Sequence, residues 1–355
     1  MQVSGLAFSF MIDTVRPQQQ TERIPLPAPA LLRQESPVSV NGLQTVSESR
    51  DAIRQVMSHL DDRMLIIVGP CSIHDTSAAL EYMTRLAVLS SKLSDKLLIV
   101  ARAYFEKPRT TVGWRGLIND PRMDGTYDMA EGLRLARRLL VQITDMGLPV
   151  ATELLDTATH DYYTDLVSFG AIGARTTESQ PHRAMASGLP LPVGFKNATD
   201  GGVQVALDAM VSAGASHSYI GFDDDGQSCV VKTHGNKDTS LILRGGRQSQ
   251  PNFDRVSVAR AVADLDRVGL PKALIVDASH ANSGYDPMQQ PFVAERVVTQ
   301  RLEGESALRG IMIESNLFSG KQPISPNMRY GVSVTDGCLG WDETAGLLTR
   351  LHSLL

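Results

Sequence analysis

The sequence predicts a (β/α)8 TIM barrel with an N-terminal extension and a β-hairpin inserted after strand 6. Three observations lead to this fold. Eight short apolar segments recur along the chain, helical patterns separate most of them, and the segments are continuously apolar, as parallel strands buried on both faces should be. Eight strands alternating with helices are typical of a barrel whose core takes about 250 residues. The chain of 355 residues therefore leaves room for insertions.

The predicted strands follow one another along the chain as "MLIIVG" (64–69), "LLIVA" (97–101), "LPVATE" (148–153), "AIGA" (171–174), "PVGFK" (192–196), "HSYIGF" (217–222), "ALIVD" (273–277) and "GIMIE" (310–314). Apolar residues at helical spacing predict helices at residues 129–147, 201–214, 254–269 and 342–355. The first three of these helices stop at a glycine, which is a common helix end.

Two insertions account for part of the surplus length. One covers residues 103–128, after the second strand. The other follows the sixth strand, where "SCVVKTH" and "SLILRGG" are expected to form extra strands as a hairpin. The "DDDG" at 223–226 lacks the spacing of a calcium loop and predicts a hairpin turn. Two separate α/β domains are the structural alternative, although no linker between the strands supports them.

The chain is expected to divide near residue 60. Residues 1–60 are predicted to form an N-terminal arm and a leading helix that make oligomer contacts, and residues 61–355 form the barrel. The stretch 16–37 is rich in Pro, Gln and Glu and contains "PLPAPALL". That composition favours an extended arm lying on another surface or subunit.

Composition restricts the partners and the compartment. The net charge is −5, from 34 Lys and Arg against 39 Asp and Glu, which disfavours broad nucleic-acid binding but allows a basic pocket for a small anion. Three widely spaced cysteines are typical of a reducing compartment. The apolar "GLAFSFMI" near the N-terminus has no cation before it and is too short to span a bilayer. We therefore predict a cytoplasmic protein without nucleic-acid or membrane partners.

Cations gather where the predicted strands end, which is where a (β/α)8 barrel places its functional groups. The segment "ARAYFEKPRTT" follows the second strand, and the full set is Arg102, Lys107, Arg109, Arg175, Lys196 and Arg244. A lone cation is usually a solvated surface group, but a buried cluster of like charges is unstable unless an anion fills it. Arginine binds phosphate and carboxylate through two parallel hydrogen bonds. The sequence therefore predicts a site for more than one anionic group, phosphates included.

A second set of residues at the same ends could hold a divalent transition metal. Its members are Cys71, His280, Glu314 and Asp336. Thiolate, imidazole and carboxylate together form a mixed ligand set for such a metal. Each alone has an ordinary explanation, such as a packed thiol or a hydrogen-bonded loop histidine. His74, three residues after Cys71, is a rival ligand.

Several long motifs resemble the type I 3-deoxy-D-arabino-heptulosonate 7-phosphate (DAHP) synthases. They are "GPCSIHD", "YFEKPRTTVGWRGLINDP", "GAIGARTTESQ", "PVGFKN" and "DASHANS", and the resemblance covers nearly the whole chain from about Arg23 onward. It implies a metal-dependent, aldol-type transferase on a (β/α)8 barrel. Such an enzyme condenses phosphoenolpyruvate with D-erythrose 4-phosphate in the first step of the shikimate pathway, toward chorismate and the aromatic amino acids.

The same resemblance assigns site residues. The metal, one of Mn2+, Fe2+, Co2+ or Zn2+, is implied at Cys71, His280, Glu314 and Asp336. The phosphoenolpyruvate site falls on Arg102, Lys107, Glu153, Arg175, Lys196 and Arg244. The erythrose 4-phosphate site falls on Lys107, Pro108, Arg109 and Thr110. Catalytic roles are implied for Lys107, Glu153, Cys71 and His280. Lys107 is the candidate for proton transfer near the aldehyde oxygen, and Glu153 for handling the water.

The resemblance also implies an oligomer, a homodimer or homotetramer, with inhibition by one aromatic amino acid. The effector site falls on His160, Asp161, Leu189, Pro190, Tyr219 and Gly221, with residues 1–60 as a further candidate part. Glycine at 221 leaves room for the hydroxyl of tyrosine, so tyrosine is the favoured effector. Pro190 and the "THDYY" from 159 depart from the family pattern, as does Ala198, and insensitivity stays the main alternative.

Two rival functions remain open from the sequence. One is the related synthase that uses arabinose 5-phosphate as the sugar, although the "KPRTT" block and the length favour the four-carbon sugar. The other is a non-catalytic barrel that senses a phosphorylated metabolite or serves as a partner subunit. Such a protein should have lost a metal ligand or an anchoring cation, and none of these residues is missing here.

Overall fold

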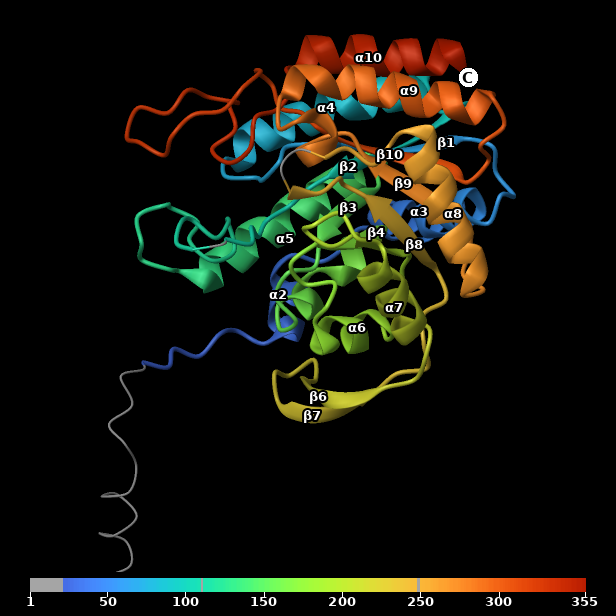
Figure 1. The fold of residues 1–355 in the computed structure, drawn as a ribbon. Helices are drawn as coiled ribbons and strands as arrows, with labels where there is room; N and C mark the ends of the chain where they lie inside the picture. The colour runs from blue at the N-terminus through green and yellow to red at the C-terminus, as the bar shows by residue number, and fades with distance from the viewer. Residues whose placement is uncertain (1–21, 110, 248–249) are drawn as a thin grey trace, which may run out of the picture.

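A closed ring of eight parallel strands forms the centre of the molecule (Figure 1). The computed structural model describes residues 22–109, 111–247 and 250–355. The ring runs β1-β10-β9-β8-β5-β4-β3-β2, so neighbours in the ring are also successive barrel strands of the chain. Their bounds are β1 Met64–Gly69, β2 Leu97–Arg102, β3 Val150–Glu153, β4 Phe169–Ile172, β5 Val193–Lys196, β8 Thr239–Leu243, β9 Leu274–Asp277 and β10 Leu308–Glu314. The predicted (β/α)8 barrel is confirmed.

Helices surround the ring of strands, and two of them, α2 and α3, come before its first strand in the chain. The helices are α2 Pro29–Glu35, α3 Val40–Met57, α4 Thr76–Lys92, α5 Met129–Asp145, α6 Gln180–Ala186, α7 Gln204–Ala213, α8 Arg255–Arg267, α9 Gln290–Leu302 and α10 Trp341–Leu354. The 3-10 turns η1 His160–Tyr162 and η2 Thr164–Leu166 stand between β3 and β4, where an α-helix would usually lie; η4 His280–Ser283 and η5 Pro287–Gln289 precede α9. The four helices expected from periodicity correspond to α5, α7, α8 and α10.

Both faces of the barrel strands are buried, which explains their continuously apolar sequence. Along β1, Leu65 and Ile67 pack in one apolar cluster, and Ile66 and Val68 pack in the other. Successive side chains of a strand point to opposite faces, so the first cluster fills the barrel interior and the second faces the helices. Every barrel strand is buried along its whole length.

Helix α3 closes the amino end of the barrel. Its residues Ile53, Val56 and Met57 belong to the interior cluster. The buried Arg309 of β10 donates through Nε to the carbonyl oxygen of Val56 at 2.7 Å and through Nη2 to that of Asp61. These bonds hold the end of α3 and the following turn against β10. The carboxyl end of the barrel is therefore the end left for chemistry.

The prediction of strand six was wrong. "HSYIGF" was expected in the barrel, but Ser218–Phe222 forms β6, which pairs antiparallel with β7 (Ser228–Lys232) in a hairpin outside it. The barrel strand is β8, from the segment expected to belong to the hairpin. The hairpin is therefore inserted before the sixth barrel strand. Burial explains the exchange, since β6 and β7 alternate between exposed and half-buried residues whereas β8 is buried throughout. The turn predicted at 223–226 does connect β6 and β7.

The N-terminal arm is shorter than expected from its composition. Residues 29–35 form α2, with Pro29 at a position where proline suits a helix start and Leu32 buried. The apolar segment 5–12 lies outside the described residues. The fourth strand begins two residues earlier than predicted. No helix in the described residues is long and apolar enough to span a membrane.

Gly132 in α5 allows the loop after β2 to approach the helix. A Cβ placed there would lie 2.2 Å from the carbonyl oxygen of Ile118 and 2.6 Å from that of Leu117, and neither backbone atom can move aside cheaply. We expect Gly132→Ala to lower the free energy of unfolding by about 1–3 kcal/mol, the usual cost of overpacking. Urea titration followed by circular dichroism measures it.

Gly346→Ala is the matched control, since Gly346 also lies within a helix, α10. A Cβ there meets only the end of the Arg350 side chain, at 3.4 Å. Alanine should leave stability unchanged or raise it by about 0.5–1 kcal/mol, because glycine is the poorer helix former. Equal changes in the free energy of unfolding for Gly132→Ala and Gly346→Ala would contradict the close approach of the loop after β2 to α5.

Candidate functional site

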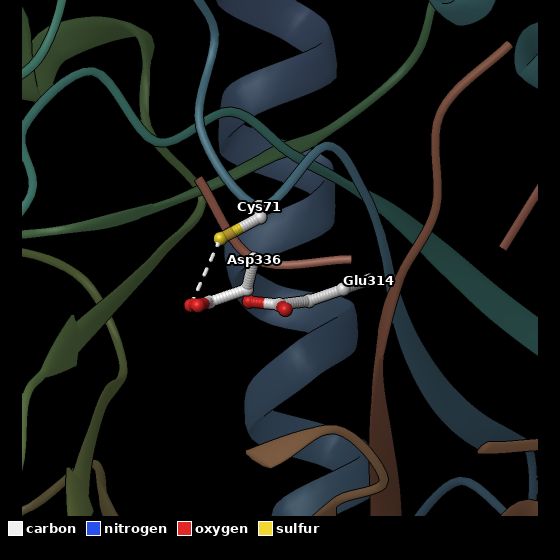
Figure 2. A group of neighbouring side chains, drawn as sticks. All are labelled: Cys71, Glu314 and Asp336. Carbon is white, nitrogen blue, oxygen red and sulfur yellow. Dashed lines mark hydrogen bonds between the residues drawn. The ribbon is translucent and has the colours of Figure 1, made fainter. Parts of the chain in front are cut away.

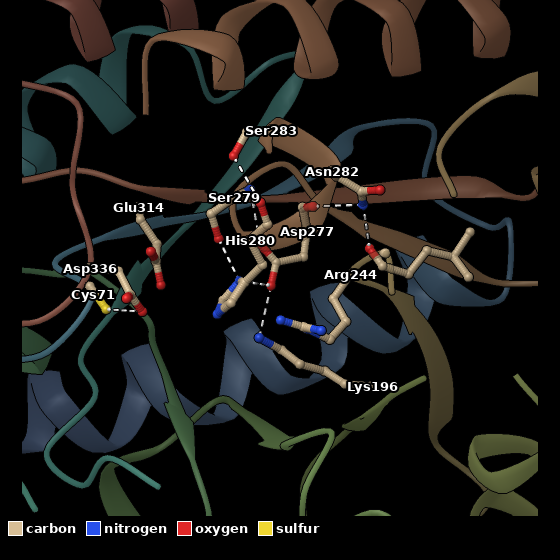
Figure 3. Close-up of polar contacts among 12 residues, drawn as sticks. Cys71, Lys196, Arg244, Asp277, Ser279, His280, Asn282, Ser283, Glu314 and Asp336 are labelled. Atoms are coloured by element: carbon tan, nitrogen blue, oxygen red, sulfur yellow. Dashed lines mark hydrogen bonds and ion pairs between the residues drawn. The ribbon is translucent and has the colours of Figure 1, made fainter. Parts of the chain in front are cut away.

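Charged side chains end five of the barrel strands at the same rim. These final residues are Arg102 of β2, Glu153 of β3, Lys196 of β5, Asp277 of β9 and Glu314 of β10. All five are buried, with exposed fractions between 1% and 6%. Figure 3 shows several of them converging on the barrel axis from different strands. The sequence analysis named all of these residues except Asp277.

Lys107 is held near this rim by the loop after β2. Its amide donates to the carbonyl oxygen of Arg115 at 2.8 Å, which folds the loop back on itself. Gly116 permits this fold, because a Cβ there would lie 2.1 Å from the carbonyl oxygen of Phe105 and its φ is +115°. The ammonium Nζ of Lys107 then lies 3.2 Å from Cys71 Sγ. Burial opposes its charge, but Cys71 and Glu314 outweigh burial and raise the pKa of Lys107.

Cys71, Glu314 and Asp336 form a cluster that could hold a metal (Figure 2). One ligand atom from each lies within 4.8 Å of the others. Cys71 Sγ donates to Asp336 Oδ2 at 3.4 Å. Burial, together with the charge of Glu314, raises the pKa of the Cys71 thiol to about 12, so the thiol keeps its proton at neutral pH. A metal binding here would have to displace that proton.

His280 shares the cavity of this cluster but stands apart from its three ligand atoms. A cavity of about 200 Å3 is lined by His280, Glu314 and Asp336 among others. His280 Nδ1 lies 2.9 Å from Asp277 Oδ2 and 2.8 Å from Ser279 Oγ. A carboxylate on one ring nitrogen is the usual support of a metal-binding histidine, since it fixes the tautomer and the ring orientation. The rival ligand His74 lines a different cavity, next to α4.

Asp277 is a buried residue of the candidate site that the sequence analysis missed. Its Oδ2 also accepts from Lys196 Nζ at 2.8 Å, so one carboxylate orients both a cation and the candidate ligand His280 (Figure 3). Burial opposes its charge, but Lys196 and His280 outweigh it and hold the pKa of Asp277 well below its ordinary value. The available signal was its place as the last residue of "ALIVD", at the end of a buried strand.

A second buried ion pair joins the two proposed sites. Arg102 Nη2 donates to Glu314 Oε1 at 2.8 Å, and both side chains are almost fully buried. Arg102 also donates to the carbonyl oxygens of Pro70 and Cys71, each at 3.2 Å. The guanidinium thus connects the end of β2 to the loop that carries Cys71.

The remaining predicted residues differ in burial. Arg244 follows β8 directly and is 9% exposed, with Nη2 3.5 Å from the Tyr285 hydroxyl. Arg175 is exposed in the loop after β4. Arg109 donates through Nε to the carbonyl oxygen of Trp114 at 2.7 Å, and Pro108 is half-buried. Thr110 lies outside the described residues.

A second cavity, of about 500 Å3, brings together all six residues of the expected effector site. These are His160, Asp161, Leu189, Pro190, Tyr219 and Gly221. They come from three separate parts of the chain, which are η1, the segment before β5, and the hairpin strand β6. His160 Nδ1 lies 2.9 Å from Asp161 Oδ1. The cavity therefore offers a mainly apolar wall with an acidic group at one side.

Comparison with known proteins agrees with this geometry. A family model described as the DAHP synthetase I family matches residues 37–349. The chain is 48% identical to the Phe-sensitive phospho-2-dehydro-3-deoxyheptonate aldolase of Escherichia coli, over 97% of each chain. It is also 48% identical to the Tyr-sensitive aldolase of that organism, over 94% of each. A solved aldolase from Francisella tularensis superposes with a TM-score of 0.91 at 43% identity, covering 94% of this chain and 98% of the other.

Glu106 is a buried carboxyl that the sequence analysis also passed over. It is 1% exposed, its Oε2 accepts from Thr159 Oγ1 at 3.0 Å, and its Oε1 has no hydrogen-bond partner among the described residues. Burial and then the charge of Asp156 raise the pKa of Glu106 to about 7. The folded protein therefore favours the protonated carboxyl.

Glu106→Gln should remove a pH-dependent loss of stability. Below about pH 4.5 the carboxyl is protonated in both folded and unfolded chains, and the wild type bears no penalty. As pH rises from there to about 7, the unfolded chain releases this proton while the folded chain keeps it, so the stability of the wild type falls relative to the variant. We expect the difference to grow by roughly 2–3 kcal/mol between pH 5 and pH 8.5. Urea unfolding at both values measures it.

The exposed Glu48→Gln on α3 is the control and should show no such growth. A constant difference between Glu106→Gln and the wild type across this range would mean that Glu106 is already ionised in the folded protein at pH 5.

Proposed function

The chain belongs to the DAHP synthetase I family, and from that premise and the geometry above we propose which residues perform its reaction. The protein condenses phosphoenolpyruvate with D-erythrose 4-phosphate and releases phosphate, in the first step of the shikimate pathway. The product is 3-deoxy-D-arabino-heptulosonate 7-phosphate. The observation that carries the assignment of residues is the buried cation set beside the Cys71, Glu314 and Asp336 cluster.

Phosphoenolpyruvate is held by the cations and one carboxylate at the strand ends. The proposed contacts are Arg102, Lys107, Glu153, Arg175, Lys196 and Arg244. Arg102, Lys107 and Lys196 are almost fully buried, and a buried cation that contacts an anionic substrate exerts a stronger attraction than one in water. The substrate brings both a carboxylate and a phosphate, which suits a site with several cations from different strands.

Erythrose 4-phosphate is held by the loop after β2. Lys107 and Pro108 approach the sugar, and Arg109 with Thr110 binds its phosphate. The bond from Arg109 to the Trp114 carbonyl keeps the Arg109 side chain on its own loop, near the mouth of the barrel. This arrangement puts Lys107 between the two substrates.

The proposed metal ligands are Cys71, His280, Glu314 and Asp336. A thiol, an imidazole and two carboxylates fit a divalent transition metal, one of Mn2+, Fe2+, Co2+ or Zn2+. When bound, such an ion would polarise the aldehyde carbonyl of the sugar as a Lewis acid. Asp277 would hold the His280 ring through Nδ1 and leave Nε2 to face the ion.

The side chains of the site orient the substrates and move protons. C3 of phosphoenolpyruvate bonds to the aldehyde carbon, and Lys107 supplies the proton that the aldehyde oxygen takes. Water then adds to the electron-poor C2, and Glu153 accepts a proton from that water. The C2–oxygen bond to the phosphate breaks, phosphate leaves, and the ketone of the seven-carbon sugar forms. The paired cations keep both anions in reacting geometry throughout.

Purified protein should release phosphate only when both substrates are present, and a chelator should abolish the activity, with Mn2+, Fe2+ or Co2+ restoring it. Phosphate and the seven-carbon ketose are measured together. Cys71→Ser should lose most of the activity because the ligand set loses its thiolate. Cys229→Ser, in the hairpin, is the matched control and should keep it.

Three outcomes would contradict this assignment. Equal turnover with arabinose 5-phosphate would favour the related synthase, and no turnover with either sugar would favour a non-catalytic barrel. Full turnover by protein shown to be free of metal would remove the metal from the reaction.

The second cavity is proposed to bind an aromatic amino acid, with tyrosine favoured. The two E. coli relatives are equally similar to this chain and are named for different amino acids, so identity does not choose between them. The apolar walls suit a ring, and Asp161 suits the ammonium group of the ligand. At Gly221 a Cβ would lie 2.7 Å from Val231 Cγ2, so any side chain there would crowd the cavity wall.

Tyrosine at millimolar concentration should lower the initial rate at subsaturating phosphoenolpyruvate. Gly221→Ser should raise the tyrosine concentration needed for half inhibition by about tenfold, because it occupies the space for the phenol hydroxyl. Val230→Ser, on the exposed face of the same hairpin, should leave it unchanged. Inhibition by phenylalanine alone would show that Gly221 does not choose the ligand, and insensitivity to all three aromatic amino acids would assign the loss of binding to Pro190 and its neighbours.

Residues 1–60 are proposed to make the contacts of a homodimer or homotetramer. Support comes from apolar side chains that this part of the chain leaves exposed. In the described part, residues 22–60, they are Ile24, Leu26, Leu31, Val40, Leu43 and Leu60, with exposed fractions from 44% to 84%. A second copy of the chain is the proposed occupant of this surface, since contact would remove these groups from water.

A further inference from the structure

Tyr104 lies beneath the proposed site, in the interior of the barrel. It comes two residues after the end of β2 and is fully buried. It packs in the interior cluster with Phe169 and Ile242, whereas its neighbour Phe105 packs in the outer cluster. The side chain therefore points to the barrel axis. None of the roles assigned above includes it.

The ring of Tyr104 is a platform for Arg102. The guanidinium carbon of Arg102 lies 3.5 Å from the centre of the Tyr104 ring. A cation over an aromatic face is attracted by the negative charge of that face, and more strongly where water is excluded. Both residues are buried, at 1% and 0% exposed. The contact therefore stabilises one orientation of the guanidinium.

The Tyr104 hydroxyl makes no contribution to the contact between the ring and Arg102. It is buried and has no hydrogen-bond partner among the described residues. An unpartnered buried hydroxyl is unfavourable, so the ring, and not the hydroxyl, is the part of the side chain that the fold uses. Phenylalanine should serve equally well at this position.

The other strong contact of Arg102 is shared with the candidate metal cluster. Arg102 pairs with Glu314 at 2.8 Å, and Glu314 is also one of the three clustered ligand groups. A carboxylate that binds a divalent ion has less charge to offer a neighbouring guanidinium. The ring of Tyr104 does not compete for the ion, so its hold on Arg102 persists whether or not the cluster is filled.

We propose that Tyr104 is a positioning residue for phosphoenolpyruvate: its ring keeps the Arg102 guanidinium aimed at the substrate anion while Glu314 serves the metal. The inference rests on the proposed function, in which Arg102 binds phosphoenolpyruvate. It adds a residue that acts through Arg102 and does not touch the substrate.

The test measures the affinity of the Mn2+-loaded protein for phosphoenolpyruvate by calorimetry, and its kinetic constants with both substrates. Tyr104→Leu should weaken phosphoenolpyruvate binding and raise the KM for it by roughly tenfold, the scale of a desolvated cation–π contact. The KM for erythrose 4-phosphate should change less than about twofold. Tyr104→Phe should restore wild-type values, since it retains the ring.

Phe169→Leu is the matched control. Phe169 is an equally buried aromatic residue of the interior cluster, at the start of β4, and Arg102 is not stacked on its ring. It should leave phosphoenolpyruvate binding unchanged. If Tyr104→Leu does not fold, Tyr104→Met, whose flexible side chain adapts better to the space of the ring, carries the same comparison.

Each result decides for or against the platform. Equal weakening in Tyr104→Leu and Phe169→Leu would assign the effect to a loosened core and overturn the proposal. Weak binding by Tyr104→Phe would assign the role to the hydroxyl and overturn it as well. Wild-type affinity in Tyr104→Leu would overturn this inference alone, whereas a wild-type protein that binds no phosphoenolpyruvate would overturn the proposed function with it.

Discussion

Two buried ion pairs at the carboxyl end of the barrel, Arg102–Glu314 and Lys196–Asp277, are the contacts on which the site depends. Charges taken out of water are costly, and they stay ionised inside a protein only when each has a partner. Both pairs are formed by the last residues of barrel strands, where the closed sheet brings the ends together. The fold thus supplies the neutralisation that allows Arg102 and Lys196 to stay charged while buried.

Each carboxylate of these two ion pairs makes a second contact. Glu314 also belongs to the candidate metal cluster, and Asp277 also orients His280. Each carboxylate therefore neutralises a buried cation and also contacts a group of the candidate metal site. The Tyr104 ring contacts Arg102 without a charge of its own and takes no part in this neutralisation.

The active end and the second cavity are close neighbours along a short chain of contacts. His160 lines the cavity, and Thr159 comes directly before it in the chain. The hydroxyl of Thr159 donates to Glu106. Glu106 in turn precedes Lys107, whose ammonium contacts Cys71. Helix α3 closes the opposite end of the barrel, and the cavity also extends toward that end, since Arg54 of α3 donates through Nη2 to the carbonyl oxygen of Pro190 at 3.2 Å.

The barrel, and the charged residues that end its strands, could be predicted from the sequence, because both leave local signals. A strand buried on both faces is continuously apolar, and the polar residue that ends it then stands at the active rim, as Arg102, Glu153, Lys196 and Glu314 do. The long motifs added the family. Local signals failed at the sixth strand, since "HSYIGF" and "SLILRGG" are both short and apolar, and only burial on both faces distinguishes them.

Only the tertiary structure decided which residues far apart in the chain contact one another. No pattern in the sequence pairs Lys196 with Asp277, stacks Tyr104 under Arg102, or places the His280 ring against Asp277. The sequence by itself determined which groups reach the rim, because strand ends are a local property. Which of those groups touch depends on the closure of the barrel and on side-chain packing across it, and these are properties of the whole chain.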